Sequence, residues 1–239
     1  MVNRHDINQT WSLIKSGKAE GDSEINMIRQ MLDYIQADTK IFVDVGANIG
    51  THSFAVARHL ADAGRVYSFE PQRLLFQIIC GTMALNSVTN VYCYNAAVGA
   101  AAGELAVPQF DYFKPMNFGS VEFGENQIEK LDQERGNDPE KVEYVPVVTI
   151  DSVRLPGVHV LKIDAEGMEF EVLAGARETI LRFTPILIVE FFKVDFNKLG
   201  HKLEEMGYRV YIHDIVFICI PQRYGHILLK GFSEFVPRA

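Results

Sequence analysis

The residues best suited to chemistry follow an apolar run in the stretch IFVDVGANIG, residues 41–50. Asp44 lies near the end of the run, and Gly46, Asn48 and Gly50 follow in a short turn. Glycine lets a backbone approach a bound molecule closely, because it has no Cβ. The spacing lacks the three glycines of dinucleotide sites, and no Gly-Lys-Ser/Thr phosphate loop is present. We therefore expect this turn to bind a nucleotide-like ligand without cradling a phosphate.

Further polar residues close the next two apolar runs. Glu70 and Pro71 end one run, and Asn95 and Ala96 end the other. An acidic residue about 20 positions after a glycine turn can accept hydrogen bonds from both ribose hydroxyls, and we expect Glu70 to do so. Asn95 and Ala96 fall where an adenine edge would lie, and Asp44 can meet a cationic group. Both carboxylates could instead have purely structural roles. Asp44 could cap the turn that follows it, and Glu70 could stabilise the start of the next helix through the helix dipole.

A second unusual stretch is LKIDAEGME, residues 161–169. Lys162, Asp164 and Glu166 alternate at the end of a run that would otherwise be buried, and Glu190 closes the following run. Burying unpaired charges is costly, so Lys162 is expected to pair with a carboxylate. The three carboxylates should lie close together at the carboxyl ends of these runs. Their mutual repulsion should raise the pKa of at least one of them.

The elements that position these residues alternate along the chain. We expect strands over 40–45, 65–70, 90–98, 159–165, 185–192, 208–215 and 226–230, and helices over 51–63, 72–86, 167–183 and 196–207. The apolar periodicity of residues 1–40 predicts a helical extension. Strands interleaved with helices predict a doubly wound, mostly parallel α/β sheet, with an antiparallel pair at one edge. Ligands of such sheets bind at the carboxyl ends of the strands.

Residues 97–158 interrupt this alternation. Residues 104–108 and 143–150 are candidate edge strands, with a long stretch of turn formers, aromatics and charges between them. A loop this long is usually functional or disordered. We expect its aromatic first half, with Tyr112, Met116 and Phe118, to cover the site as a lid, or to pack on the sheet edge. The charged second half is expected to be mobile.

Composition limits the remaining possibilities. The 239 residues fit a single domain, and 48% of them are apolar, which is enough for a sizeable core. A formal net charge of −8 disfavours nucleic acid or an anionic membrane surface as a partner. Cys80, Cys93 and Cys219 are widely spaced, which suits the reducing cytoplasm. We expect no membrane insertion, because the longest apolar run is too short. The N-terminal helix could pack on a second copy of the chain.

Taken together and in order, the motifs FVDVGANIG, VYSFEPQ, LNSVTNV, VTIDSV, LKIDAEGMEFEVLAGA and PILIVE resemble the FkbM-type S-adenosylmethionine-dependent methyltransferases. The resemblance covers about residues 41–191. It implies a class I methyltransferase fold with a seven-stranded sheet and S-adenosylmethionine as methyl donor. It also implies a small-molecule or glycan acceptor, most often a hydroxyl group on a sugar or natural product. From the chain length, we expect residues 1–239 to form one domain. The positions that match the family are Asp44, Gly46, Asn48, Gly50 and Glu70, and then Asp164, Glu166 and Gly167.

Methyl transfer from a sulfonium is an in-line displacement, so the protein mainly holds the acceptor and helps to remove its proton. We expect Asp164 or Glu166 to orient the acceptor or act as base, with Glu190 in support; His52 and His213 are weaker candidates. Alternatives left open are N-methylation, a non-catalytic cofactor-binding module, and a divalent metal held by the three carboxylates, although we assign no metal ligand. A nicotinamide-dependent oxidoreductase is disfavoured by the missing third glycine.

Overall fold

Continuous apolar runs form the central strands of one large sheet, because helices cover both of its faces. The structure, a computed structural model, describes residues 1–18, 21–123, 128, 130–133, 142–225, 227 and 231–238. The strands are β1 (Lys40–Val45), β2 (Gly64–Phe69), β3 (Val91–Tyr94), β4 (Ala97–Val98), β5 (Gly103–Pro108), β6 (Val142–Val148), β7 (Val160–Ile163), β8 (Ile186–Glu190), β9 (Tyr208–His213), β10 (Val216–Pro221) and β11 (Ser233–Glu234). The helices are α1 (Gln9–Ser16), α2 (Asp22–Tyr34), α3 (Thr51–Leu60), α4 (Arg73–Leu85), α5 (Ile150–Val153), α6 (Glu169–Gly175), α7 (Arg177–Phe183) and α8 (Phe196–Glu205).

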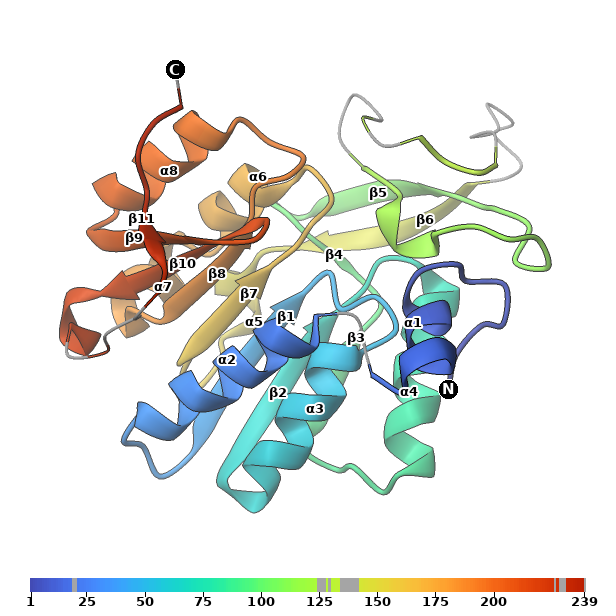
Figure 1. Cartoon of the computed structure of the whole chain (residues 1–239), viewed down its shortest axis with the longest axis horizontal. Coiled ribbons are helices and arrows are strands. Elements are labelled where there is room, and N and C mark those ends of the chain that lie inside the picture. Colours follow the sequence, from blue (N-terminus) through green and yellow to red (C-terminus); the bar gives the residue numbers. More distant parts are fainter. Residues whose placement is uncertain are drawn as a thin grey trace.

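The main sheet has the strand order β3-β2-β1-β7-β8-β10-β9-β11 within the described residues (Figure 1). Strands β3, β2, β1, β7 and β8 are parallel, whereas β10 runs antiparallel to both β8 and β9. The chain winds outward from β1 to β3 and then returns to the other side of β1 at β7. The carboxyl ends of β1 and β7 therefore form the switch point at which α/β sheets bind ligands.

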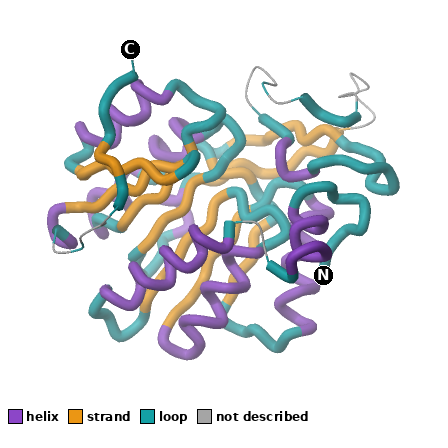
Figure 2. Tube along the Cα trace, viewed as in Figure 1, coloured by secondary structure: helices purple, strands orange, loops and turns teal. Residues whose placement is uncertain are grey.

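Two layers of helices bury the faces of this sheet (Figure 2). Helices α2 and α3 cover one face, where Ile28 and Val56 pack against Phe42 and Val66 of the strands. The other face packs against α5 to α8 in a second apolar cluster. Phe42 is fully buried, so its replacement by alanine would cost about 3–5 kcal/mol of stability. The site residues thus stand on a rigid support.

A small second sheet, with strand order β4-β6-β5, lies beside the main one (Figure 1). Residues 104–108 and 143–150 were predicted as edge strands. The first range lies in β5, and the second in β6 up to Val148, where that strand ends. The two strands pair antiparallel to each other instead of joining the main sheet. The predicted strand over 90–98 is likewise divided between β3 and β4. The side chain of Asn95 bonds to the carbonyls of Glu70 and Pro71, at 3.0 and 2.9 Å, where the chain leaves the main sheet.

The C-terminal part of the sheet differs from the prediction. The expected strand over 208–215 ends at His213, and a turn at Asp214, with φ of 49°, leads into the antiparallel strand β10. The main sheet has eight described strands, not the predicted seven, because the two-residue β11 pairs with β9. The strand predicted over 226–230 lies outside the described residues, apart from Ile227, as does most of the charged half of the 97–158 insertion.

Two predicted helices are broken. The helix predicted over 167–183 divides into α6 and α7 at Ala176, and the N-terminal extension consists of α1 and α2. Between α1 and α2, Gly17 and Gly21 adopt φ of 70° and 79°, which ends one helix and begins the other. None of the described helices is long and apolar enough to cross a membrane.

Candidate active site

The turn after β1 depends on a left-handed glycine. Gly46 has φ of 76°, a conformation that residues with side chains rarely adopt. A Cβ at this position would overlap the backbone carbonyl of Asp164, so glycine allows the ends of β1 and β7 to approach closely. The amides of Gly46 and Ala47 both donate to the carbonyl of Phe69 at 3.0 Å. The turn is thereby fixed against the end of β2.

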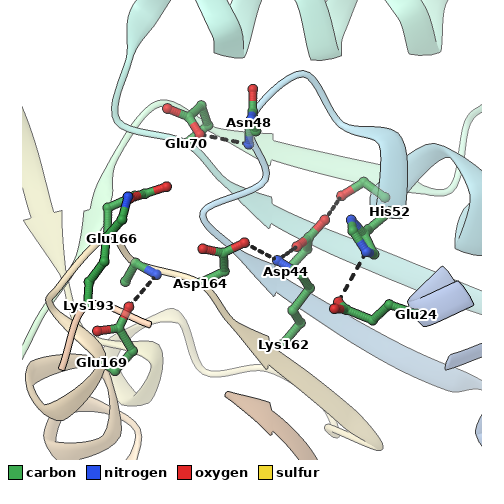
Figure 3. Close-up of polar contacts among 12 residues, drawn as sticks. Glu24, Asp44, Asn48, His52, Glu70, Lys162, Asp164, Glu166, Glu169 and Lys193 are labelled. Carbon is green, nitrogen blue, oxygen red and sulfur yellow. Dashed lines mark hydrogen bonds and ion pairs between the residues drawn. The ribbon is translucent and has the colours of Figure 1, made fainter. Parts of the chain in front are cut away.

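Glu70 follows β2 and is buried beside this turn. Its Oε2 accepts a hydrogen bond from the amide of Asn48 and its Oε1 from the amide of Gln72, both at 2.8 Å (Figure 3). Burial raises the pKa of Glu70 to about 8 despite these two hydrogen bonds, and the charges of Asp164 and Asp44 add to the rise. The carboxyl group is therefore held in one orientation, and its charge can change near neutral pH.

Charged side chains of β1 and β7 form a network beside the turn (Figure 3). Lys162 Nζ lies 2.9 Å from Asp164 Oδ2 and 3.9 Å from Asp44 Oδ1, and Asp44 Oδ2 accepts a hydrogen bond of 2.6 Å from Ser53. Burial acts to lower the pKa of Lys162, but the carboxylates of Asp164 and Asp44 outweigh it and raise that pKa above its usual value. The prediction that Lys162 pairs with a carboxylate is confirmed.

A pocket opens where these strand ends meet. It holds about 530 Å³ of free space, including its open mouth, which is the size of many small-molecule and cofactor sites. Six of the residues predicted to bind a cofactor line it: Gly46, Asn48, Glu70, Pro71, Ala96 and Asp164. Phe69, Val98 and Met168 add apolar surface. The pocket thus offers an apolar wall beside a carboxyl group, as an aromatic base joined to a sugar requires.

A wider cavity adjoins this pocket and shares Asn48, Asp164 and Glu166 with it. It has about 1300 Å³ of free space, including open solvent, and Glu190 at the end of β8 also lines it. Burial raises the pKa of Glu190 to about 10, and the charges of Asp164, Glu166 and Glu169 add to this effect, whereas Lys193 opposes it. Glu190 is therefore neutral at pH 7 and can donate a hydrogen bond.

The turn from β7 into α6 is also held by polar contacts. Glu166 has a left-handed φ of 53° and forms an ion pair with Lys193. Glu169 Oε1 accepts hydrogen bonds from the amides of Ala165, at 2.9 Å, and Gly167, at 3.3 Å. Burial raises the pKa of Glu169 to about 7 against these hydrogen bonds, and Asp164 adds to the rise. Glu166 is thereby presented to the pocket and the cavity.

Part of the 97–158 insertion lies against the turn after β1. The side chain of Gln72 donates to the carbonyl of Phe118 at 2.7 Å, and the amide of Phe123 donates to the carbonyl of Glu166 at 3.4 Å. Gly119 packs so closely on Asn48 that a Cβ would overlap the Asn48 amide nitrogen. We call residues 110–123 the covering segment, because they contact both strand ends that frame the pocket.

The N-terminal residues hold the covering segment in place. Backbone hydrogen bonds join Ile7 to Met116 at 3.2 Å and Met116 to His5 at 3.1 Å. Tyr112 stacks on Phe118 with ring centroids 4.5 Å apart, and the side chain of Asn3 bonds to the carbonyl of Tyr112 at 3.2 Å. The chain before α1 therefore helps to position the segment that covers the pocket.

The structure does not bring every predicted site residue to the pocket wall. Asp44 lies behind the turn with Ser53, and Gly50 precedes α3 with φ of 82°. Asn95 joins the ends of β2 and β3 without lining the pocket. The sequence interpretation did not single out Gln72, Met168, Lys193 or Glu24. Across the described parts of the chain, no group of three or more His, Cys, Asp or Glu side chains is arranged to hold a metal ion.

Comparison with known proteins identifies the family. The model of the methyltransferase FkbM domain matches residues 44–210, which is well over half of the chain. The chain belongs to the FkbM methyltransferase family. As a member of that family, it is a methyltransferase that uses S-adenosylmethionine as its methyl donor.

Relatives of this FkbM methyltransferase include "Methyltransferase 1" of Beauveria bassiana (strain ARSEF 2860). It is 27% identical over 190 residues, which cover 72% of this chain and 74% of that protein. "Methyltransferase sdnD" of Sordaria araneosa is 26% identical over 169 residues, 62% of this chain and 64% of that protein. A crystal structure of methyltransferase FkbM from Methylobacillus flagellatus KT superimposes with a TM-score of 0.54 at 19% identity. It shares the class I fold and covers 78% of this chain, which spans only 44% of that longer protein.

The described residues of this FkbM methyltransferase fit S-adenosylmethionine. Asn48 Oδ1 is buried in the pocket wall without a hydrogen-bond partner among the described residues, so a donor from a bound molecule would satisfy it. The Glu70 carboxyl and the apolar Phe69 side chain meet on the same wall, which matches a ribose joined to adenine. Gly46 of the glycine turn and the following acidic residue Glu70, which the sequence had singled out, both line the pocket.

Proposed function

We propose that this FkbM methyltransferase methylates a hydroxyl group on a sugar or on another natural-product small molecule. When bound, S-adenosylmethionine supplies an activated methyl group. The proposal rests on the wide cavity beside the cofactor pocket, whose wall carries Asp164, Glu166 and Glu190. Ionised carboxylates accept hydrogen bonds and the neutral Glu190 donates them, so this wall suits a ligand with several hydroxyl groups.

In this proposal, the cofactor is held at the ends of β1, β2 and β3. Glu70 accepts hydrogen bonds from the ribose hydroxyls, each worth roughly 1.5–3 kcal/mol when the carboxylate is charged. Ala96 and Pro71 contact the adenine side of the pocket, and Gly46 allows the backbone to approach. The cationic amino-acid end is then directed towards the Asp164 side of the pocket.

The acceptor binds in the wider cavity. Asp164 and Glu166 line both spaces, so they are placed to orient a hydroxyl oxygen towards the methyl group. Holding the reacting atoms at about 3–3.5 Å is the main contribution that a protein makes to such a displacement. The covering segment and the N-terminal residues exclude water from the junction of the two spaces.

A cytoplasmic location is part of the same proposal. Cys80, Cys93 and Cys219 are all free thiols, and the described residues contain no disulfide bond between them. Free thiols persist where glutathione and thioredoxin keep proteins reduced. Fractionation of cells that express the chain tests this location.

The experiment that tests the function is methyl transfer to a defined panel. The full chain is incubated with isotopically labelled S-adenosylmethionine and with sugars, hydroxylated polyketides and matched amines, and products are identified by mass spectrometry. We expect label on an oxygen of a sugar or polyketide, and loss of transfer in Glu70→Ala. Label found only on the amines would show that the enzyme is an N-methyltransferase and not an O-methyltransferase. Binding without transfer to any acceptor would contradict the proposal.

A further inference from the structure

A histidine and a glutamate from different helices lie against each other (Figure 3). His52 lies in the first turn of α3, and Glu24 lies in the first turn of α2. His52 Nε2 is 3.1 Å from Glu24 Oε1, and the two side chains are only 14% and 15% exposed. Both line the cavity together with Asp164 and Glu190. Glu24 lies outside the region matched by the family model.

The pairing is specific because both atoms are buried. His52 Nε2 and Glu24 Oε1 form an ion pair at 3.1 Å, and neither atom has a hydrogen-bond partner elsewhere among the described residues. Burial acts to raise the pKa of Glu24, but contact with His52 and the positive charge of Lys162 outweigh it, and the pKa is lowered. An ionised Glu24 favours the tautomer in which Nε2 carries the hydrogen and Nδ1 is free to accept a proton.

Three of the other acidic groups that line the cavity are less suited to accept a proton. Asp164 is bound to Lys162 at 2.9 Å, and Glu166 is paired with Lys193. Glu190, with its pKa raised to about 10, already carries a proton at pH 7. A base must be unprotonated and within reach of the reacting hydroxyl.

Charged groups of two further strands act on Glu24. Lys162 comes from β7 and His213 from the end of β9, and His213 also lines the cavity. Asp44 and Lys162 are already coupled to each other, at 3.9 Å. The pH dependence of catalysis therefore reflects these neighbouring groups as well as His52.

We propose that His52, oriented by Glu24, is the general base that takes the proton of the acceptor hydroxyl. The inference rests on the proposed function. The acceptor O–H bond breaks, its electron pair forms the new O–CH₃ bond, and the S–CH₃ bond of the sulfonium breaks with its electrons returning to sulfur. The proton ends on His52 Nδ1, and Glu24 stabilises the imidazolium without being protonated itself. The N-terminal helix α2 is thus part of the catalytic apparatus.

A second pair supplies a matched control. His59 Nε2 and Asp33 Oδ1 lie 2.8 Å apart and join the same two helices, but they are more exposed, at 28% and 62%, and do not line the cavity. The variants are His52→Gln and Glu24→Gln, compared with His59→Gln and Asp33→Asn. Thermal unfolding shows that each variant is folded, and calorimetry gives its affinity for S-adenosylhomocysteine.

With the panel acceptor that the wild type methylates, we expect His52→Gln to lower kcat by about 10²–10⁴ and to lose the acidic limb of the pH–rate profile. Glu24→Gln should lower kcat about tenfold and shift that limb, and both controls should stay within about twofold of the wild type. An unchanged kcat in His52→Gln overturns the proposal. So does an equal loss of S-adenosylhomocysteine affinity, because His52 would then hold the cofactor.

A second measurement needs no acceptor. Diethyl pyrocarbonate acylates unprotonated, accessible imidazole nitrogens, and peptide mapping locates the modified residue. In the full chain with S-adenosylhomocysteine, we expect modification of His52, with His59 as the internal reference. If His59 is modified and His52 is not, the cavity presents no free imidazole nitrogen and the dyad fails. If His52 is modified but the wild type methylates nothing on the panel, the proposed function fails instead.

Discussion

Two single residues at the pocket wall adopt states that few residues could adopt. Gly46 is left-handed against the β7 backbone, and Glu70 is a buried carboxyl group whose pKa is raised to about 8. Two amide hydrogen bonds orient the Glu70 carboxyl, yet burial still favours its neutral form near pH 7. A ligand that donates hydroxyl groups to this carboxyl favours the ionised form, so ligand binding and proton release should be coupled.

The first prediction concerns that coupling. In the free protein the pKa of Glu70 is about 8, and donors from the ribose should lower it in the complex. Affinity for S-adenosylhomocysteine should therefore fall as pH drops below about 8, by up to about tenfold per pH unit, and level off above that pH. Calorimetry in buffers of different ionisation enthalpy should show proton release on binding.

The control for this prediction is Glu70→Gln, which keeps the size of the side chain and cannot ionise. It should bind S-adenosylhomocysteine at least tenfold more weakly above pH 8, and this difference should shrink at lower pH. If the pH dependence of the variant matched that of the wild type, the proton would come from another group.

The second prediction is that Gly46→Ala damages the site and the fold together. The added Cβ would overlap the Asp164 carbonyl at a φ of 76°, so the free energy of unfolding should fall by about 2–4 kcal/mol. Gly207→Ala is the matched control, because Gly207 has φ of 87° but no atom within 4 Å of an added Cβ. Denaturant titration should show a clearly smaller loss there; equal losses would mean that backbone strain alone decides the effect.

At the scale of elements, strong apolar runs followed by glycine or carboxylate were predicted well. Strands β1, β2, β7 and β8 lie within their predicted ranges or match them closely, because burial on both faces demands such runs. The hairpin of β9 and β10 was misplaced, since both strands are apolar and only the turn at Asp214 separates them. The separate small sheet depends on long-range pairing of β5 with β6, which local periodicity does not encode.

The same limit applies to the site. Gly46, Glu70 and Asp164 were located by their position at strand ends, which follows from the alternation of elements. Glu24 could not be found that way, because its partnership with His52 arises only when α2 packs on α3. Gln72 had a weak signal, as it stands directly after Glu70 and Pro71, but its bond to Phe118 depends on the path of the insertion.

The third prediction tests the covering segment through Gln72. Its side chain donates to the Phe118 carbonyl at 2.7 Å and accepts from the Tyr112 hydroxyl at 3.4 Å, and it is buried. Gln72→Ala leaves a buried carbonyl unpaired at a cost of about 1–3 kcal/mol, which should loosen the segment. Stopped-flow fluorescence should show S-adenosylhomocysteine dissociating about tenfold faster. Gln77→Ala, at an exposed position of α4, the helix that follows Gln72, should leave that rate unchanged. Equal rates in both variants would mean that the segment does not retain the ligand.

At the scale of the whole molecule, acidic groups gather at one edge of the sheet in a chain of net charge −8. Burial raises the pKa of Glu70, Glu169 and Glu190 to about 8, 7 and 10. In the unfolded chain these groups ionise near pH 4.5, so the folded state binds more protons between that pH and the raised pKa values. These groups therefore lower the free energy of unfolding as pH rises. The folded state should be more stable at pH values down to about 5.

The last prediction isolates this effect at Glu190. Because its folded pKa lies near 10, folding at pH 8 requires protonation of a group that is ionised in the unfolded chain. Glu190→Gln removes that requirement, so it should raise the free energy of unfolding by on the order of 3 kcal/mol at pH 8 and by much less at pH 5. Urea titrations at the two pH values measure the difference, with Glu104→Gln at an exposed position of β5 as the control. A gain that is the same at both pH values would show that packing, and not proton binding, limits stability at the acceptor cavity.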